Sequence, residues 1–246
     1  MWGRRSNFME YFYTDPKDVH GTHLLLRDEE CKHLARVLRK RPGDHIAVTD
    51  GMDRMYEAVV TTINHTVAEC EIVDVQHRVN EPKVDVTVAV SLLKNPGRID
   101  FLVEKVTEFG ARAIIPLLCE RTIPKHEKHA RLEKIALAAM KQCGRSYLPK
   151  VFMLTQFETL ISHAQAYDLK LIPHEKTEQS QFVGAVLKHH PKAKNVLVVV
   201  GPEGGFTEQE MEIAAENNCV PISLGARRLR SETAAISAVS WIVGGW

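Results

Sequence analysis

The sequence lacks the features that mark membrane, secreted and metal-binding proteins. No apolar run reaches the roughly 18 residues of a membrane-spanning helix, and residues 1–7 lack the apolar segment of a secretion signal. The five cysteines stand far apart, without the paired spacing of a disulfide framework or a zinc ribbon. We therefore expect a cytoplasmic protein with reduced, mostly buried thiols, no membrane contact and no metal.

Several signatures of nucleotide and hydrolase chemistry are also missing. The sequence contains no G-x-G-x-x-G fingerprint, no Gly-Lys-Ser/Thr phosphate loop and no Gly-x-Ser-x-Gly nucleophile elbow. The histidine pairs His126/His129 and His189/His190 have no neighbouring cysteines or carboxylates at metal-ligand spacing. These absences argue against a dinucleotide-dependent oxidoreductase, a P-loop NTPase and a serine hydrolase.

Charge is balanced overall but clustered locally. The 246 residues carry a net charge of +1, and 44% are hydrophobic, which is ample for a packed core. Residues 31–43 hold five basic side chains and no acidic one, and residues 119–150 hold eight basic side chains against three acidic. Such clusters are typical of surfaces that neutralise RNA phosphates, although a solvated helix face has the same composition.

Residues 1–78 are predicted to form a small β-barrel. Short alternating runs at 23–26, 46–48, 56–63 and 67–73 are typical of half-buried antiparallel strands. Residues 28–41 have helical spacing and are followed by Pro42-Gly43-Asp44. The polar segment 80–83 indicates a domain boundary.

Residues 82–246 are predicted to form an α/β domain with a mostly parallel sheet, because strands alternate with helices. Ligands of such sheets bind beyond the carboxyl ends of the strands. The expected strands are 84–93, 113–118, 150–154, 169–173, 195–200 and 220–224, and the expected helices are 98–109, 127–143, 179–188, 207–217 and a last one from Ser231.

Two loops at strand ends are the candidate site. Gly201-Pro202-Glu203-Gly204-Gly205 follows the strand 195–200, and its glycines allow a ligand to approach bare backbone. A capping box, Thr207 to Glu210, then begins a helix. The second loop, 223–234, carries Arg227, Arg228 and Arg230 before a helix start, which is a natural anion site. Glu232 is either a catalytic group or a residue that compensates the helix dipole.

Together these segments resemble the bacterial 16S ribosomal RNA (uracil-N3)-methyltransferases of the SPOUT class. The similarity covers nearly the whole chain, and the two loops 200–207 and 224–234 match the two most specific motifs of that family. The other matching segments are 11–13, 33–39, 42–44, Lys94, 105–110, 120–121 and 142–145. Arg228 departs from the family, whose members more usually carry an apolar residue there.

The resemblance implies a PUA-like RNA-binding barrel, a knotted S-adenosylmethionine site and a homodimer. The trefoil knot lies in the second domain, and the substrate is 16S RNA in the small ribosomal subunit, methylated at N3 of uridine 1498 in the conventional numbering of that RNA. The implied cofactor-binding residues are Pro173, His174, Val200, Gly201, Gly204, Gly205, Ser223, Leu224, Gly225, Arg228 and Leu229.

For the reaction, we expect Arg230 to stabilise the uracil anion, with Glu232 orienting Arg230 or accepting the proton. The expected phosphate contacts are Arg36, Arg39, Lys40, Arg41 and Arg121. Two alternatives stay open. One is a related knotted methyltransferase that acts on a ribose hydroxyl, and the other is a non-catalytic RNA-binding protein with the same fold.

Overall fold

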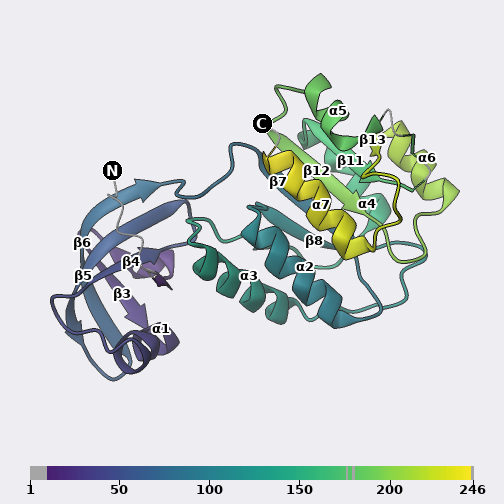
Figure 1. Ribbon diagram of the computed structural model, residues 1–246. Helices are drawn as coiled ribbons and strands as arrows, with labels where there is room; N and C mark the ends of the chain where they lie inside the picture. Colours follow the sequence, from purple (N-terminus) through teal and green to yellow (C-terminus); the bar gives the residue numbers. More distant parts are fainter. Residues whose placement is uncertain (1–9, 176, 179–180, 245–246) are drawn as a thin grey trace. The chain divides into compact units, whose positions relative to one another are not determined.

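The computed structural model describes residues 10–175, 177–178 and 181–244, which form two compact units (Figure 1). Unit 1 contains the described residues up to Glu81 together with Met140–Leu148, and unit 2 contains the remainder. The sequence does not predict that the second segment, 140–148, belongs to unit 1. Residues 1–7, considered above for a secretion signal, residues 179–180, expected to begin a helix, and residues 245–246 lie outside the described residues.

Unit 1 is built on a mixed sheet. Within the described residues its six strands follow the order β1-β4-β5-β6-β3-β2, with β1 parallel to β4 and the other neighbours antiparallel. The four predicted strands are confirmed, whereas β1 and β2 are too short for a periodic signal. The bounds are β1 (Tyr11–Tyr13), β2 (Val19–His20), β3 (His23–Arg27), β4 (His45–Thr49), β5 (Arg54–Ile63) and β6 (Val67–His77).

The helix of unit 1 ends earlier than the predicted Arg41. Helix α1 (Asp28–Lys32) continues as a wider π-turn over His33–Val37. The N–H of Lys40 donates to the carbonyl of Leu34 at 3.1 Å, and Arg39 adopts a left-handed conformation with φ of 53°. This wide closing hydrogen bond around a left-handed residue is how helices commonly stop, so periodicity alone overestimated the length.

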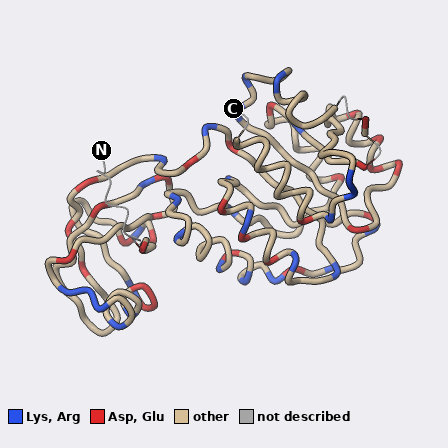
Figure 2. The backbone as a smooth tube through the Cα atoms, viewed as in Figure 1, with Lys and Arg blue, Asp and Glu red and all other residues tan. Residues whose placement is uncertain are grey.

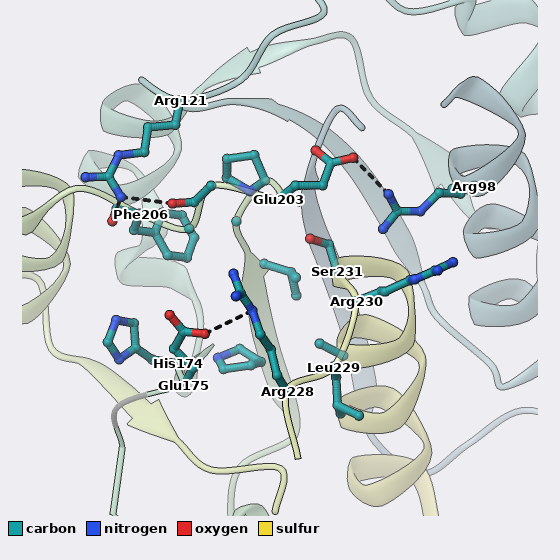
Figure 3. Close-up of a pocket in the computed structure, with 17 residues that line it drawn as sticks. Arg98, Arg121, His174, Glu175, Glu203, Phe206, Arg228, Leu229, Arg230 and Ser231 are labelled. Carbon is teal, nitrogen blue, oxygen red and sulfur yellow. Dashed lines mark hydrogen bonds and ion pairs between the residues drawn. The ribbon is translucent and has the colours of Figure 1, made fainter. Parts of the chain in front are cut away.

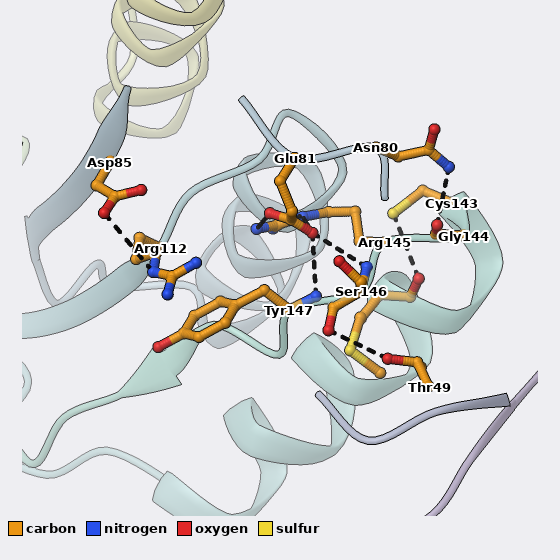
Figure 4. Close-up of polar contacts among 11 residues, drawn as sticks. Thr49, Asn80, Glu81, Asp85, Arg112, Cys143, Gly144, Arg145, Ser146 and Tyr147 are labelled. Atoms are coloured by element: carbon orange, nitrogen blue, oxygen red, sulfur yellow. Dashed lines mark hydrogen bonds and ion pairs between the residues drawn. The ribbon is translucent and has the colours of Figure 1, made fainter. Parts of the chain in front are cut away.

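A buried ion pair joins the two segments of unit 1 (Figure 4). The side chains of Arg145 and Glu81 are only 2% and 1% exposed, and their closest atoms are 2.7 Å apart. Glu81 also accepts hydrogen bonds from the backbone N–H groups of Ser146 and Tyr147. Because the carboxylate compensates both a buried cation and two buried donors, it fixes the segment 140–148 in place.

Unit 2 contains a parallel sheet. Among the described residues its strands follow the order β10-β8-β7-β12-β11-β13, with β9 paired to β8. Strands β7 and β12 lie at the centre, and their near-continuous apolar burial is typical of parallel sheets covered on both faces. The bounds are β7 (Asp85–Ser91), β8 (Ala113–Leu118), β9 (Lys150–Val151), β10 (Thr155–Gln156), β11 (Leu169–Pro173), β12 (Asn195–Val200) and β13 (Cys219–Ile222).

Helices cover both faces of this sheet (Figure 1). Helices α2 and α7 contact each other, and α7 packs on β7 and β12, whereas α4 and α6 share a core cluster with Ala89, Leu197 and Val199. No described helix is long and apolar enough to cross a membrane. The bounds are α2 (Pro96–Glu108), α3 (His129–Cys143), α4 (Phe157–Ser162), α5 (Val183–His189), α6 (Glu208–Glu216) and α7 (Ser231–Gly244).

The ends of α2 are set by local sequence. Asn95 accepts a hydrogen bond from the N–H of Gly97, and Pro96 occupies the first turn, where its missing N–H costs nothing. The C-cap is Phe109, one residue before the predicted Gly110, and Gly110 follows it with a left-handed φ of 99°, as glycine commonly does after a helix. A Cβ at Gly110 would lie 2.3 Å from the ring of Pro82, so only glycine fits.

All five cysteines lie among the described residues and none takes part in a disulfide; four of the five are buried. Burial raises the pKa of Cys70 and of Cys119 to about 12. The thiolate, which is the reactive form, is therefore strongly disfavoured at both positions.

We predict that Glu81→Ala lowers the free energy of unfolding by about 3–5 kcal/mol, because it leaves a buried guanidinium without a counterion. Denaturant unfolding followed by fluorescence measures the change. The control is Glu29→Ala, which removes an exposed partner of Lys32 and should shift the midpoint little. An unchanged midpoint for Glu81→Ala would contradict the role assigned to this pair.

Candidate functional site

The candidate site lies at the carboxyl edge of the parallel sheet. Val200 pairs with Val90, and Pro173 pairs with Ile222, so the strands end at the same edge. The chain leaves β11, β12 and β13 there, in three loops that begin at His174, Gly201 and Ser223. Parallel register therefore brings together loops that are far apart in the sequence.

Two adjoining cavities open between these loops, with volumes of about 470 Å³ and 420 Å³. Residues 173–175, Arg228, Leu229 and Ala234 line both of them. Each of the eleven residues expected to bind the cofactor lines at least one cavity, as do Arg121 and Arg230, and Figure 3 shows the larger cavity. Glu232 is not among the lining residues.

The glycine loop exposes its backbone to the larger cavity. The N–H of Gly205 donates to the carbonyl of Pro202 at 2.9 Å, and Gly205 has φ of 68°. A Cβ at Gly201 would approach the ring of Phe206 to 3.1 Å. The predicted capping box is confirmed, because Thr207 and Glu210 bond reciprocally at the start of α6. The loop is thus held at both ends, and its residues Gly204 and Gly205 are exposed at the larger cavity.

The third loop is anchored through Ser223. The N–H of Ser223 donates to the carbonyl of Gln181 at 2.9 Å, and its own carbonyl accepts from Val183 at 3.1 Å. The hydroxyl of Ser223 accepts from the N–H of Gly225 at 3.3 Å, and Gly225 has φ of 107°. Ser223 is buried, while residues 225–228 are exposed, so the loop turns outward over the smaller cavity directly after its anchor.

Arg98 connects the glycine loop to the end of the arginine loop. The sequence did not predict a role for this residue. Its guanidinium donates to Glu203 of the glycine loop at 2.9 Å, and in a bidentate contact to Glu232 at 2.9 Å and 2.5 Å (the contact to Glu203 is drawn in Figure 3). These partners are 105 and 134 residues away in sequence. A single arginine in the first turn of an amphipathic helix carries no signal of such distant contacts.

Glu232 is held as a carboxylate. Burial raises its pKa, but the hydrogen bonds from Arg98 and from its own backbone, with the charges of Arg98 and Arg230, outweigh burial and leave the pKa below its ordinary value. A carboxylate with a lowered pKa is a weak base. Its described contacts therefore favour a role in holding Arg98 over a role in accepting a proton.

The remaining arginines of the site differ in their partners. Arg121 donates to the carbonyls of Gly204 and Phe206, at 2.9 Å and 3.2 Å. Arg228 forms an exposed ion pair with Glu175 at 3.3 Å (Figure 3). Arg230 is exposed, and its guanidinium makes no hydrogen bond or ion pair with the described residues, although its charge helps to lower the pKa of Glu232. Among the described arginines that line this cavity, Arg230 is thus the one whose side chain has no direct partner.

The other expected RNA contacts lie in unit 1. Arg36 is exposed in the π-turn, and Arg39 and Arg41 are exposed after it, while the ammonium of Lys40 donates to the carbonyl of His45 at 3.3 Å. Around α1 the backbone carries both basic and acidic segments (Figure 2). No group of three or more potential metal ligands is found among the residues that the structure describes.

Comparisons with known proteins cover both units. Residues 80–243 match the family model of an RNA methyltransferase domain, and residues 26–76 match that of an RNA methyltransferase PUA domain. The chain is 31% identical over 225 residues to ribosomal RNA small subunit methyltransferase E of Bacillus subtilis, with 87% of each chain covered. It is 30% identical to the protein of the same name from Synechocystis, with 92% of this chain and 75% of the relative covered.

Solved structures with a similar fold include methyltransferases. Ribosomal RNA small subunit methyltransferase E from Neisseria gonorrhoeae, bound to S-adenosyl methionine, superposes with a TM-score of 0.86 at 31% identity, with 97% of this chain and 98% of that chain covered. A putative methyltransferase from Legionella pneumophila, in complex with the bound cofactor SAM, gives a TM-score of 0.79 at 27% identity, with 94% and 96% covered.

We predict that the contribution of Glu232 to stability depends on pH. A carboxylate with a lowered pKa stabilises the fold above the unfolded pKa of about 4.3, and this contribution is lost as the pH falls through the folded pKa. At pH 7, Glu232→Gln should therefore unfold about 1–3 kcal/mol more easily than the parent protein.

The difference should begin to shrink as the pH falls below the unfolded pKa of about 4.3, and it should vanish once the pH lies below the lowered pKa of the folded protein. Denaturant titrations between neutral and acidic pH measure it. Glu208→Gln, at an exposed position in the first turn of α6, is the matched control and should change stability little throughout. A difference between parent and Glu232→Gln that persists in acid would contradict the interpretation.

Proposed function

The chain belongs to the family of RNA methyltransferases that carry a PUA domain, and we propose that it methylates small-subunit ribosomal RNA with S-adenosylmethionine as the methyl donor. The observation that carries this proposal is the pair of adjoining cavities lined by the glycine loop and the arginine loop. The names of the Bacillus and Synechocystis relatives, and the cofactor in the Neisseria and Legionella structures, support it.

More specifically, we propose that the product is N3-methyluridine at position 1498 of 16S ribosomal RNA. We also propose that unit 1 acts as the PUA-like RNA-binding barrel and that unit 2 forms the deep trefoil knot of the SPOUT class. The packing of α7 on α2, β7 and β12, and strands that neighbour one another out of chain order, support a knotted connection. A cytoplasmic location follows from a ribosomal substrate.

The cavities suit the proposed cofactor in size and chemistry. Sites for small molecules enclose about 300–1,000 Å³, and each cavity lies in this range. The remaining backbone groups of Gly201, Gly204 and Gly205, which line the larger cavity, can contact adenine or the methionine tail, because no Cβ intervenes. When bound, S-adenosylmethionine supplies an electrophilic sulfonium methyl group. The two cavities together suit an elongated cofactor with an adenosine end and an amino-acid end.

We assign stabilisation of the uracil anion to Arg230. N3 of uracil is a poor nucleophile while protonated, so the site must favour the deprotonated base. Arg230 lines the larger cavity, and its guanidinium forms no direct ion pair with the described residues, although its charge acts on the carboxylate of Glu232. Glu232 and Arg98 act as positioning residues, because their ion pair fixes the start of α7 next to Arg230.

We propose that basic side chains of both units bind the RNA backbone. The exposed basic side chains of residues 36–41, together with Arg121, are proposed to contact phosphates.

The homodimer is proposed to use the face of α2 and α7, because large apolar side chains are exposed there. Phe101 is 49% exposed, Phe109 at the end of α2 is 40% exposed, and Trp241 of α7 is 45% exposed.

The proposed function predicts a defined product. Incubation with labelled S-adenosylmethionine and small ribosomal subunits that lack the modification should place label in N3-methyluridine, identified after digestion to nucleosides. Label in a 2′-O-methyl nucleoside would instead indicate the related ribose methyltransferases. Failure to bind S-adenosylmethionine in calorimetry would favour a non-catalytic RNA-binding protein.

Arg230→Ala is expected to lower the methylation rate by about 10²–10³-fold, the usual loss when one donor to a developing anion is removed. Cofactor binding, measured by calorimetry, should be kept. Arg230→Lys retains a positive charge and should recover part of the rate, and Lys188→Ala, an exposed cation of α5, should match the parent. A normal rate for Arg230→Ala would remove this assignment.

A further inference from the structure

A third cavity lies on the other side of the first turn of α2. It encloses about 270 Å³ between the beginnings of α2 and α3 and the segment 124–128. Its walls are apolar and well buried, with Leu92, Leu93, Ile99 and Leu132 each no more than 6% exposed. Its rim carries exposed polar side chains, among them Lys94, His126 and Lys128.

The third cavity adjoins the larger cavity of the candidate site, because the first turn of α2 and Glu203 contribute to both. Arg98 faces the larger cavity, while its neighbours Gly97 and Ile99 line the third one. The N–H of Lys94 donates to Glu203 at 3.2 Å, and Arg98 donates to the same carboxylate oxygen at 2.9 Å. A single turn of helix therefore separates the two cavities.

The basic cluster at residues 119–150 explains the charge at its rim. Most of these cations are already engaged, since Arg121 and Lys125 bond to carbonyls, Arg131 pairs with Asp100, and Lys141 and Arg145 pair with glutamates. The ammonium groups of Lys128 and Lys94 make no hydrogen bond or ion pair with the described residues, whereas the carbonyl of Lys128 accepts from the N–H groups of Arg131 and Leu132. Two lysines without a direct side-chain partner among the described residues thus stand at the mouth of an apolar cavity. The two carboxylates in its lining are engaged elsewhere, Asp100 with Arg131 and Glu127 with the N–H of Leu154.

We propose that this cavity holds one unpaired base of the RNA substrate, next to the nucleotide that is methylated. The inference rests on the proposed function and adds a second nucleotide site to it. The apolar walls accept the flat, weakly polar faces of a base, and Lys94 and Lys128 neutralise the phosphates that flank it. His126 and the guanidinium of Arg131 supply planar groups on which a base can stack.

The size and the charge of the third cavity favour a single RNA base over a whole cofactor or an apolar peptide side chain. The volume is below the range of about 300–1,000 Å³ that encloses whole cofactors or drug-sized ligands, so it suits a single base. An apolar peptide side chain would gain nothing from the two uncompensated lysines, whereas a nucleotide carries a phosphate beside its base. RNA enzymes commonly hold unstacked bases in this way, because single-stranded segments are where sequence is read.

Photo-crosslinking tests the location directly. RNA fragments spanning the methylation site, with 4-thiouridine at single positions around the target, are irradiated with the full-length protein and S-adenosylmethionine. We expect crosslinks from one neighbouring position to peptides that contain residues 92–99 or 124–132. Crosslinks confined to other peptides would overturn the proposal, whether or not the protein proves to be a methyltransferase.

Two variants test the contribution to binding. Leu132→Phe fills the cavity, and Lys128→Ala removes a rim cation. Each should raise the KM for RNA roughly tenfold, the order expected when a stacked base loses its site, while kcat, S-adenosylmethionine affinity and thermal stability are kept. Lys128→Ala should also reduce the salt dependence of RNA binding by about one charge.

The matched control is Lys134→Ala, which removes another exposed cation, from helix α3 just after Lys128, that does not line the cavity. It should leave the KM for RNA unchanged. If the parent methylates RNA but Leu132→Phe and Lys128→Ala behave like Lys134→Ala, the second nucleotide site is wrong and the proposed function stands. If the two variants instead change the oligomeric mass without changing RNA binding, the cavity belongs to an interface between copies.

Discussion

The ion pair of Arg98 with Glu203 and Glu232 is the interaction on which the site depends. The three residues come from the first turn of α2, the glycine loop and the start of α7, and the contacts measure 2.5–2.9 Å. Parallel strands bring these segments to one edge of the sheet, but pairing alone does not fix their loops. One guanidinium with its donors in a rigid fork can satisfy two carboxylates at once, and so it sets the distance between the glycine loop and the arginine loop.

This arrangement also determines which charge is available for chemistry. Arg98 is used by two carboxylates, Arg228 by Glu175, and Arg121 by the carbonyls of the glycine loop. Arg230 lines the larger cavity and has no direct side-chain partner among the described residues, which supports the proposal that it acts on the bound substrate. The side chain of Glu232 stays ionised. Burial raises its pKa, but the contacts with Arg98 outweigh burial and leave the pKa below its ordinary value. A site built in this way favours an anionic substrate through fixed positive charge more than through a strong base.

The sequence predicted the periodic parts of the fold and the two loops, because those signals are local. Strands β7 and β12, helices α2 and α6, Gly110 at the end of α2 and the Thr207 capping box all follow from patterns within a few residues. The contributions of Arg98 and of Glu81 with Arg145 were not predictable, since each depends on partners more than 60 residues away. The early end of the first helix was missed for a different reason. A left-handed residue such as Arg39 closes a helix without interrupting its apolar spacing.

The carboxylate of Glu203 links the two sides of α2. It accepts from Arg98, which faces the larger cavity, and from the N–H of Lys94, which stands at the rim of the third cavity. Because one carboxylate oxygen accepts from both donors, a shift of Glu203 would change the contacts of Arg98 and of Lys94 together. If the two proposed sites are occupied as we propose, any coupling between them has to be reciprocal. The proposed methyl-donor loop and the third cavity thus share one carboxylate.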